Sequence, residues 1–425
     1  MYPYYATFFI SILLCALGER QLHRSRFWSC PLISLSVLCP VILAGARDFS
    51  IGLDISAYGN YVFETACNYS NFSRYMRTHR EIESLYKVMA FLVSRFTDNA
   101  HWFYFVTALI ICGCTMAGLL YYRGRGWCSL TLAWACFLFI IYGDTLNIMR
   151  QCIAVAIAFA AFPLFLEKKY LLYFIAQIAA IQFHVTGMIA FCLPLIYILM
   201  KIYRAKWIYI CAVIACFAAI QFYSPALAYL IRIHLLPQKF TRYLADGFAF
   251  ALNPTILRLP FLLPILYFND RFCGFDCYGN ELRTTSSKRQ KPLVKNAGKK
   301  IHLNWGIRLR AAMQDSPEGE NNVDRTLGML VIFVLLLEIC TVQLRSVLPT
   351  LYRISYYFSY YRFIAYARLT DILRRDNRVL MILALFAYLC VLWYYQNVLQ
   401  GNNMIYPYIY APDWFRRITY FSTGI

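Results

Sequence analysis

The sequence predicts an all-α, polytopic membrane protein with about twelve transmembrane helices. Of its 425 residues, 60% are hydrophobic and 18% aromatic, and the mean hydropathy is +0.51, which is too apolar for a soluble domain of this size. The apolar residues form separate runs of roughly 16 to 22, the length that an α-helix needs to cross about 30 Å of hydrocarbon. We therefore expect a single integral membrane domain over residues 1–425.

Each apolar run is taken as one span. The first run precedes its charged flank and has no small-residue cleavage site, so we expect a retained helix rather than a signal peptide. The eleventh contains Arg353 and Arg362 among its tyrosines, so a tilted or re-entrant element is the alternative to a regular crossing. The predicted spans are 3–17, 28–45, 101–122, 127–142, 148–166, 170–184, 187–200, 207–223, 255–268, 327–344, 352–368 and 379–396.

Loop charges predict the orientation. Lys and Arg follow the first, third, fifth and seventh spans, which makes that face cytoplasmic and puts both termini outside. Residues 46–100 then form an extracytoplasmic loop, whose segment 47–98 carries six basic and six acidic residues. Residues 270–325 form a basic cytoplasmic loop, which we expect to be partly disordered. The net charge of +20 therefore reflects topology in a lipid bilayer and predicts no nucleic-acid partner.

The 16 cysteines indicate packing rather than chemistry. Most of them lie inside apolar runs, and their spacing matches no metal site. We expect neither a metal nor a cofactor.

Polar residues from distant parts of the chain map to the predicted extracytoplasmic face. Arginines beside a few carboxylates suit an anionic substrate such as a phosphate or diphosphate, because the guanidinium fork matches phosphate oxygens. The carboxylates and one histidine are available to move a proton. The converging residues are Arg47, Asp48, Asp54, Glu83, Asp144, Asn147, Arg150, Gln151, His184, Arg345 and Arg353.

Each of these residues also has a structural explanation when it is taken singly. Arg150 is expected on a helix that carries Asn147 and Gln151 one turn apart, but a lone arginine there can simply reach the headgroups. Glu83 can begin an amphipathic helix, and His184 at a helix end can be a hydrogen-bonded structural residue. Only their convergence favours a site.

Five short motifs, in order, resemble the EpsG family of Wzy-like polymerases. They are ARDFSIGLDISAY (46–58), with Arg47, Gly52, Asp54 and Tyr58; ESLY, which begins at Glu83; LNIMRQCIAVAIAFAAF (146–162), with Asn147, Arg150, Gln151 and Ala154; FHVTG (183–187), with His184 and Thr186; and LYRISYYF (351–358), with Arg353, Tyr356 and Tyr357. Thr186 stands where the family usually has serine. The basic loop is longer than expected of this family.

The resemblance implies a GT-C/Wzy-like membrane glycosyltransferase. Its expected reaction is the polymerisation of lipid-linked repeat units into exopolysaccharide, capsule or O-antigen, outside the bacterial inner membrane, with undecaprenyl diphosphate as carrier. Asp54, Glu83, Arg150 and His184 are the expected catalytic residues, with either carboxylate as the base. Arg47, Tyr58, Asn147, Gln151, Thr186 and Arg353 are expected to bind the substrate or its diphosphate. A flippase and a chain-length regulator are the expected partners.

Three other functions stay open. An O-antigen ligase would share the donor and the arginine chemistry but use another acceptor. A non-enzymatic flippase for polyprenyl-linked glycans would line a path through the bilayer with its charges. A membrane acyltransferase would centre its site on a histidine.

Overall fold

The computed structural model describes residues 1–22, 24–203, 206–236, 250–274, 321–346 and 351–414, together with residues 238 and 241. Within these residues the regular structure is helical, and the backbone makes only one isolated β-bridge, between Arg47 and Tyr410. The prediction of an all-α polytopic bundle is confirmed. Most of the predicted basic loop, residues 275–320, lies outside the described residues. The chain forms two compact units, unit 1 (Met1–Phe191 and Val379–Ile425) and unit 2 (Cys192–Arg378).

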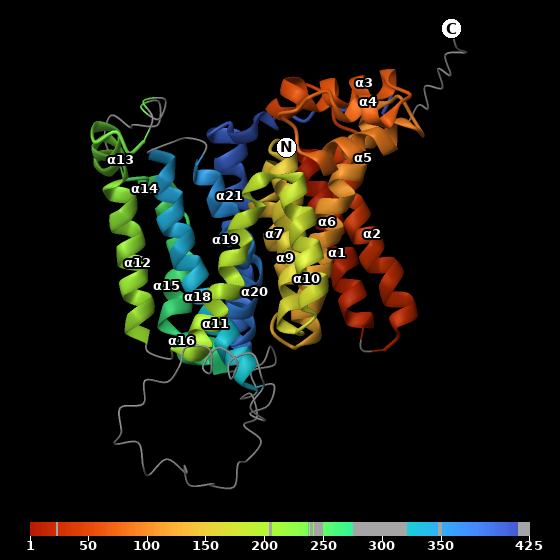
Figure 1. The fold of residues 1–425 in the computed structure, drawn as a ribbon. Coiled ribbons are helices and arrows are strands. Elements are labelled where there is room, and N and C mark those ends of the chain that lie inside the picture. The colour runs from red at the N-terminus through yellow and green to blue at the C-terminus, as the bar shows by residue number, and fades with distance from the viewer. Residues whose placement is uncertain are drawn as a thin grey trace, which may run out of the picture. The chain divides into compact units, whose positions relative to one another are not determined.

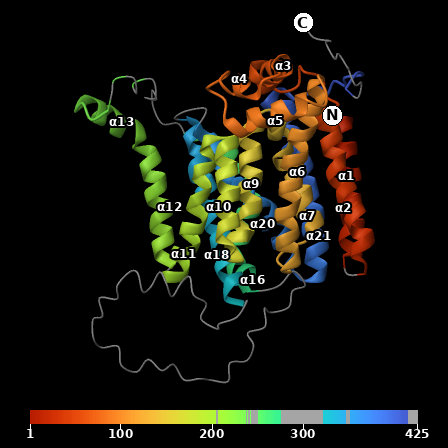
Figure 2. The same ribbon diagram turned by 45° about the vertical axis from the view of Figure 1, so that its right-hand side comes forward.

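Unit 1 combines long helices with a cap of shorter ones. The long helices run side by side, and α3 and α4 lie across one end of them (Figures 1 and 2). A π-helical turn, Ile55–Gly59, leads into the cap, and a 3-10 segment, Val185–Phe191, follows α10. The helices are α1 (Tyr2–Gln21), α2 (Arg26–Gly45), α3 (Asn60–Asn68), α4 (Phe72–Met76), α5 (Ser84–Ser94), α6 (Ala100–Gly124), α7 (Leu130–Ile140), α8 (Tyr142–Thr145), α9 (Met149–Leu166), α10 (Tyr170–Phe183) and, for most of its length, α21 (Arg375–Tyr394).

Helix α7 begins where a side chain from another helix caps it. The carboxylate of Glu19, near the end of α1, accepts hydrogen bonds from the backbone N–H groups of Leu130 and Thr131, both at 2.9 Å. It is also paired with Arg123 at 2.5 Å. Because the first N–H groups of a helix lack partners within it, this contact both starts α7 and fixes it against α1.

Small residues allow α9 to pack at the centre of unit 1. Ala154 and Ala158, one turn apart, are buried, and side chains this small let neighbouring membrane helices approach closely. On α6, a Cβ added to Gly118 would lie 2.6 Å from the ring of Phe159, so the two helices approach closely at that point. Close packing against α6 therefore fixes the position of α9 and of the residues at its N-terminal end.

The segment 403–411 returns over the end of unit 1 that carries the cap. The backbone N–H of Ala411 donates to the carbonyl of Ala46 at 2.9 Å, and the N–H of Asp48 donates to the carbonyl of Ile409 at 2.9 Å. The hydroxyl of Tyr4 donates to the carbonyl of Ile405 at 2.9 Å. Tyr4 in α1, the segment 403–411 and the residues just after α2 are thus joined into one hydrogen-bonded layer.

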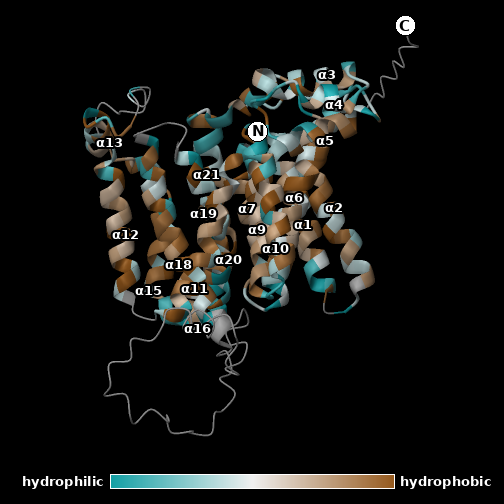
Figure 3. Ribbon diagram, in the orientation of Figure 1, coloured by the Kyte–Doolittle hydropathy of each residue, from teal (hydrophilic) through white to brown (hydrophobic). Residues whose placement is uncertain are grey.

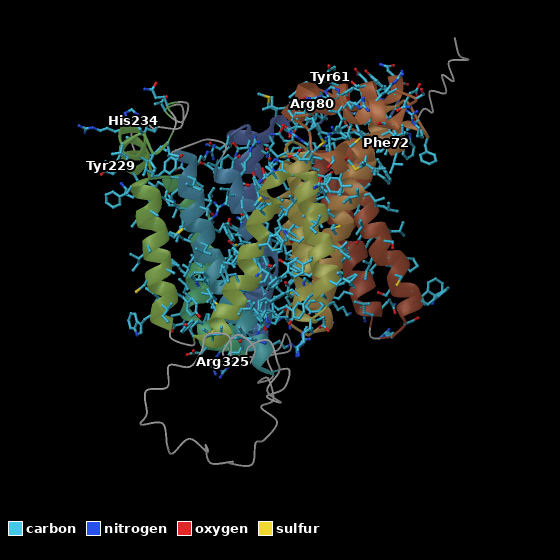
Figure 4. The ribbon with its side chains drawn as sticks, in the orientation of Figure 1. Tyr61, Phe72, Arg80, Tyr229, His234 and Arg325 are labelled. Atoms are coloured by element: carbon cyan, nitrogen blue, oxygen red, sulfur yellow. The ribbon has the colours of Figure 1, made fainter. Side chains whose placement is uncertain are left out.

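Unit 2 contains shorter and more interrupted helices. In Figure 4, Arg325 lies at one end of this unit, and Tyr229 and His234 lie at the other. Helix α18 ends in a 3-10 turn, Gln343–Ser346, and a second one, Leu351–Ser355, precedes α19. The helices are α11 (Cys192–Ile202), α12 (Lys206–Gln221), α13 (Tyr223–Arg232), α14 (Leu252–Ile256), α15 (Leu259–Tyr267), α16 (Asn269–Gly274), α18 (Asn321–Val342), α19 (Tyr356–Ser359) and α20 (Tyr361–Asp371).

Within the described part of the chain, six helical segments are long and apolar enough to cross a membrane, and α12 with α13, bent by 58°, would make a seventh. Apolar residues dominate the bodies of the long helices (Figure 3). Other predicted spans are broken: 255–268 is divided between α14 and α15, and 352–368 is a series of short pieces. All of Tyr361–Asp371 is buried inside unit 2, which explains how this polar segment is tolerated. The six segments are Phe27–Gly45, Ala100–Gly124, Met149–Leu166, Val185–Ile202, Arg325–Arg345 and Arg375–Leu399.

Candidate functional site

Gly52 brings the first motif against the third. Its φ of +96° lies in the region that favours glycine, and an added Cβ would lie 2.4 Å from the carbonyl oxygen of Leu146. This close backbone contact places the backbone N–H of Asp54 at 3.2 Å from Oδ1 of Asn147, to which it donates a hydrogen bond. Two segments about 90 residues apart are thereby fixed together.

Arg150 is the centre of the assembly that results. It is the second residue of α9, and its Nη1 donates to Oε2 of Glu83 at 2.6 Å. Its guanidinium carbon lies 4.2 Å from the centroid of the Tyr58 ring, a cation–π contact. The Nε–H makes no hydrogen bond to any described residue. We call Asp54, Tyr58, Glu83 and Arg150 the Arg150 cluster.

Tyr58 links the arginine to the second carboxylate of the cluster. Its hydroxyl donates a short hydrogen bond to Oδ2 of Asp54, one turn earlier in the chain. Burial, and then the adjacent Asp54 carboxylate, raise the pKa of Tyr58 well above its usual value. The hydroxyl therefore stays protonated and acts as a donor to Asp54. Asp54 itself is 9% exposed, so its carboxylate is buried beside a cation–π pair.

The side chains of Asn147 and Asn403 form a hydrogen-bonded chain from the backbone of Asp54 to Asp144. Nδ2 of Asn147 donates to Oδ1 of Asn403 at 3.2 Å, and Nδ2 of Asn403 donates to Oδ1 of Asp144 at 2.8 Å. Asn403 has a φ of +67°, within a tight turn near Gly401. The prediction that Asn147 lies on the same helix as Gln151 is wrong, because Asn147 precedes α9, in the break after α8. In this break, Oδ1 of Asn147 accepts from Asp54 and its Nδ2 donates to Asn403.

His184 and Thr186 lie at the edge of the same cluster. The backbone N–H of Val185, between them, donates to Oε1 of Glu83 at 3.4 Å. Nδ1 of His184 lies 2.7 Å from Oγ1 of Thr186 and also accepts from the backbone N–H of Thr186 at 3.3 Å. Because that amide can only donate, Nδ1 carries its lone pair and the ring proton lies on Nε2 in the neutral histidine. Glu83 thus joins Arg150 to the histidine segment.

Arg47 occupies a different environment from Arg150. It is 1% exposed, its Nη2 lies 3.5 Å from Sδ of Met149, and its guanidinium carbon is 5.4 Å from the centroid of the Tyr104 ring. Its Nε–H makes no hydrogen bond to any described residue, and burial lowers its pKa below the usual value. Arg47 therefore lies directly behind the residue that precedes Arg150, in an aromatic enclosure.

Gln151 and Arg353 are the other two residues predicted to bind the substrate. Gln151 is buried in α9, next to Arg150. Arg353 belongs to unit 2, in the 3-10 turn Leu351–Ser355. Among the described residues, no three His, Cys, Asp or Glu side chains come together in a way that could hold a metal ion.

Two residues of the site were missed from the sequence. Asn403 lies in a polar turn far from every motif, and no pattern in GNNM (401–404) indicates its partners. Tyr86 is fully buried in α5, within electrostatic range of Arg150 and Asp54, and its hydroxyl makes no hydrogen bond to the described residues. The sequence offered one signal for Tyr86. It follows Glu83-Ser84-Leu85 and falls on the inner face of α5.

One comparison with known proteins identifies a family. The family model described as "EpsG family" matches residues 31–410, which include every member of the Arg150 cluster and Asn403. No curated protein and no solved structure matches the chain. The chain is therefore a multi-pass membrane protein that belongs to the EpsG family, a family of Wzy-like polymerases.

Proposed function

We propose that this protein polymerises polyprenyl-diphosphate-linked repeat units into exopolysaccharide, capsule or O-antigen on the extracytoplasmic face of the bacterial inner membrane. The observation that carries the proposal is the state of Arg150. Glu83 and Tyr58 hold its guanidinium in place, yet its Nε–H makes no hydrogen bond to the described residues, and Asp54 lies on the other side of Tyr58. The Arg150 guanidinium is thus fixed in position, retains one N–H that can donate, and lies near the Asp54 carboxylate. Such a group can stabilise a diphosphate as it leaves.

The reaction needs one bond to form, one to break and one proton to move. The hydroxyl of the acceptor sugar attacks the anomeric carbon of the donor glycan, and the bond from that carbon to the diphosphate oxygen breaks. The diphosphate leaves with the electron pair, and Arg150 stabilises the charge that develops on it. Asp54 accepts the proton of the attacking hydroxyl, as a general base. The product is a glycan longer by the donor chain and a free polyprenyl diphosphate.

The remaining residues are assigned supporting roles. Glu83 orients Arg150 through their ion pair and can serve as the base if the acceptor approaches from the His184 side. We assign His184, through Nε2, and Thr186 to bind a phosphate or hydroxyl oxygen. Asn147 positions Asp54. Arg47, Tyr58, Gln151 and Arg353 are assigned to substrate or diphosphate binding.

The test is complementation in the native host. The gene is deleted and replaced by wild type, Arg150→Ala or Arg74→Ala, and the polysaccharide is run on a gel beside the extracted lipid-linked intermediates. Arg74 is a matched control, because it is an exposed arginine on α4 of the cap. We expect single lipid-linked repeat units to accumulate in the deletion and in Arg150→Ala, and normal polymer with Arg74→Ala.

Other gel patterns would identify the competing functions. Full-length polymer that fails to reach its final acceptor would indicate a ligase. Repeat units that remain on the cytoplasmic leaflet would indicate a flippase, and an intact glycan lacking an acyl group would indicate an acyltransferase. Unchanged glycan in the deletion strain would remove the proposal. Co-purification from the same strain tests the expected flippase and chain-length regulator.

A further inference from the structure

Unit 2 holds a pair of cysteines that the proposed reaction does not use. Cys216 lies on α12 and Cys340 lies on α18, and both are thiols in this structure. Cys340 is buried and Cys216 is half-buried. The two thiols are in hydrogen-bond contact with each other. Two thiols that meet across neighbouring helices can react with one another, which a cysteine that only fills space in a core cannot do.

Cys340 lies against one face of α12. Its thiol donates to the backbone carbonyl of Val213 at 3.7 Å, about one turn before Cys216. The residues of α12 that pack in the same apolar cluster as Cys340 recur at helical spacing and are Val213, Cys216, Phe217 and Ile220. Cys216 is therefore in the middle of the face that α12 turns toward α18.

A second contact fixes how the two helices are aligned. The rings of Tyr209 on α12 and Phe333 on α18 meet edge to face, with 5.6 Å between their centroids. Cys216 and Cys340 each follow their aromatic residue by seven positions, which is about two turns of helix. Equal steps along both helices mean that α12 and α18 run side by side in the same direction (Figures 1 and 2). The two thiols are thereby held opposite each other.

The contact with α18 is also what attaches α12 to its unit. Within the described residues, α12 packs chiefly on α18 and on the α13 that continues it. Its other faces are open: Trp207 is 76% exposed and Ile214 is 62% exposed. A covalent bond between Cys216 and Cys340 would fasten this peripheral helix to the rest of unit 2.

We propose that Cys216 and Cys340 are an oxidation site that forms a disulfide between α12 and α18. The oxidant is a disulfide carried by another molecule. The thiolate of Cys216, the more exposed of the two, attacks one sulfur of that disulfide and releases the other as a thiol. The thiolate of Cys340 then attacks the sulfur of Cys216 and releases the second thiol. Two cysteines are oxidised, the external disulfide is reduced to two thiols, and these thiols take up the two protons that the cysteines lose.

The predicted orientation agrees with this chemistry. Both cysteines lie in the C-terminal halves of their helices. The loop charges of the sequence predict that these ends are extracytoplasmic, and disulfides persist outside the cytoplasm. The oxidation site does not depend on the reaction proposed for unit 1.

The experiment maps the linkage in the full-length protein, in membranes of its native host. Cells are quenched in trichloroacetic acid, free thiols are blocked with N-ethylmaleimide in denaturant, and the digest is analysed by mass spectrometry for peptides joined through Cys216 and Cys340. A second sample of membranes is treated with oxidised glutathione before the acid step. We expect the linked peptides in at least one of the two samples, and their loss after dithiothreitol.

Cys211 provides the matched control, because it is an exposed cysteine on the same helix. Cys211→Ser should leave the linkage unchanged, whereas Cys216→Ser and Cys340→Ser should each abolish it. The wild-type measurement needs no substitution, so a variant that fails to fold leaves the test intact. Maleimide-labelled Cys216 and Cys340 in both wild-type samples would overturn the proposal. Linkage of Cys340 to Cys211 as often as to Cys216 would overturn it as well.

The linked protein should also unfold at a higher temperature. A disulfide between distant positions restricts the unfolded chain, so we expect the Tm of oxidised wild type to exceed that of the reduced protein by roughly 2–5 °C. Cys216→Ser should have the same Tm under both conditions. An unchanged or lower Tm in the linked wild type would contradict the fastening of α12 to α18.

Discussion

Asn147 and Asn403 are joined by a hydrogen bond of 3.2 Å across 256 positions of the chain. Asn403 also donates to Asp144, so its amide group bridges the two residues that flank the start of the third motif. Through Asn147 this bridge reaches the backbone of Asp54. The distal turn at Gly401 is therefore part of the site's support, although it carries none of the residues expected to touch the substrate.

Asn403→Gly should impair activity through position rather than folding. Glycine accepts the φ of +67°, so the variant loses the side-chain bonds without backbone strain. We expect the initial rate of polymer formation to fall about tenfold, because Asn147 and Asp54 lose their fixed orientation. Asn402→Gly, next to it, should keep the wild-type rate. A wild-type rate in Asn403→Gly would contradict the positioning role.

Gly52→Ala should separate the first and third motifs. The added Cβ would meet the Leu146 carbonyl at 2.4 Å, and the residue would be held at an unfavourable φ of +96°. We expect a loss of stability of about 1–3 kcal/mol and loss of activity. Gly113→Ala is the control, since nothing lies within 4 Å of its added Cβ, and it should be neutral or stabilising. Detergent Tm and polymer yield are measured for both, and equal effects would refute the argument.

Asp54→Asn and Glu83→Gln should affect catalysis to different extents. If Asp54 is the base, its amide loses roughly 100-fold or more in kcat. Glu83→Gln keeps an oxygen for Arg150 and loses only its charge, so we expect a loss of about tenfold that appears mainly in KM. Rates of sugar transfer from purified lipid-linked donor decide between them. The reverse order would make Glu83 the base.

Tyr58 should not titrate in the neutral range. Its raised pKa means that the folded state holds the proton more tightly than the unfolded state does. The stability that this contributes is fully present below about pH 10, the unfolded value, and is lost as the pH rises through the folded value. The Tm difference between wild type and Tyr58→Phe should therefore stay constant from about pH 7 to pH 10 and decline above it. A change in the difference near neutral pH would contradict this assignment.

Glu338→Gln should destabilise the protein more than Arg258→Gln does. Without this carboxylate, both Arg258 and Arg362 lose an ion pair in the interior of unit 2, at a cost of roughly 3–5 kcal/mol. Arg258→Gln leaves Glu338 paired with Arg362, a neutral combination. The Tm values of the two variants in detergent provide the comparison. Equal Tm values would contradict this order of stability.

The sequence was sufficient for the fold class and for the residues that meet around Arg150. Apolar runs predict helices because each must satisfy its own backbone in lipid, and the motifs identify Asp54, Tyr58, Glu83 and Arg150 without any knowledge of contacts. The contacts confirm that these four lie together. Their chemical roles stay predictions until the variants are measured.

What could not be predicted depends on tertiary contacts. Asn403 has no local pattern, because its partners are chosen by the return of the chain over unit 1. Glu338 and Arg362 were visible as charges within apolar or aromatic spans, but only the fold pairs them with Arg258. The break that removes Asn147 from α9 was likewise hidden, since LNIMRQ (146–151) reads as a continuous helix.

The hydrogen-bonded layer formed by segment 403–411 has a consequence for biosynthesis. Residues 47, 54 and 147 are translated early, but the turn that braces them follows every candidate membrane span of the described residues in chain order. Ribosomes that stop before residue 403 would release inserted helices without a braced site. The hydrogen bond between Asn403 and Asn147 can therefore form only after the last of these spans has been synthesised.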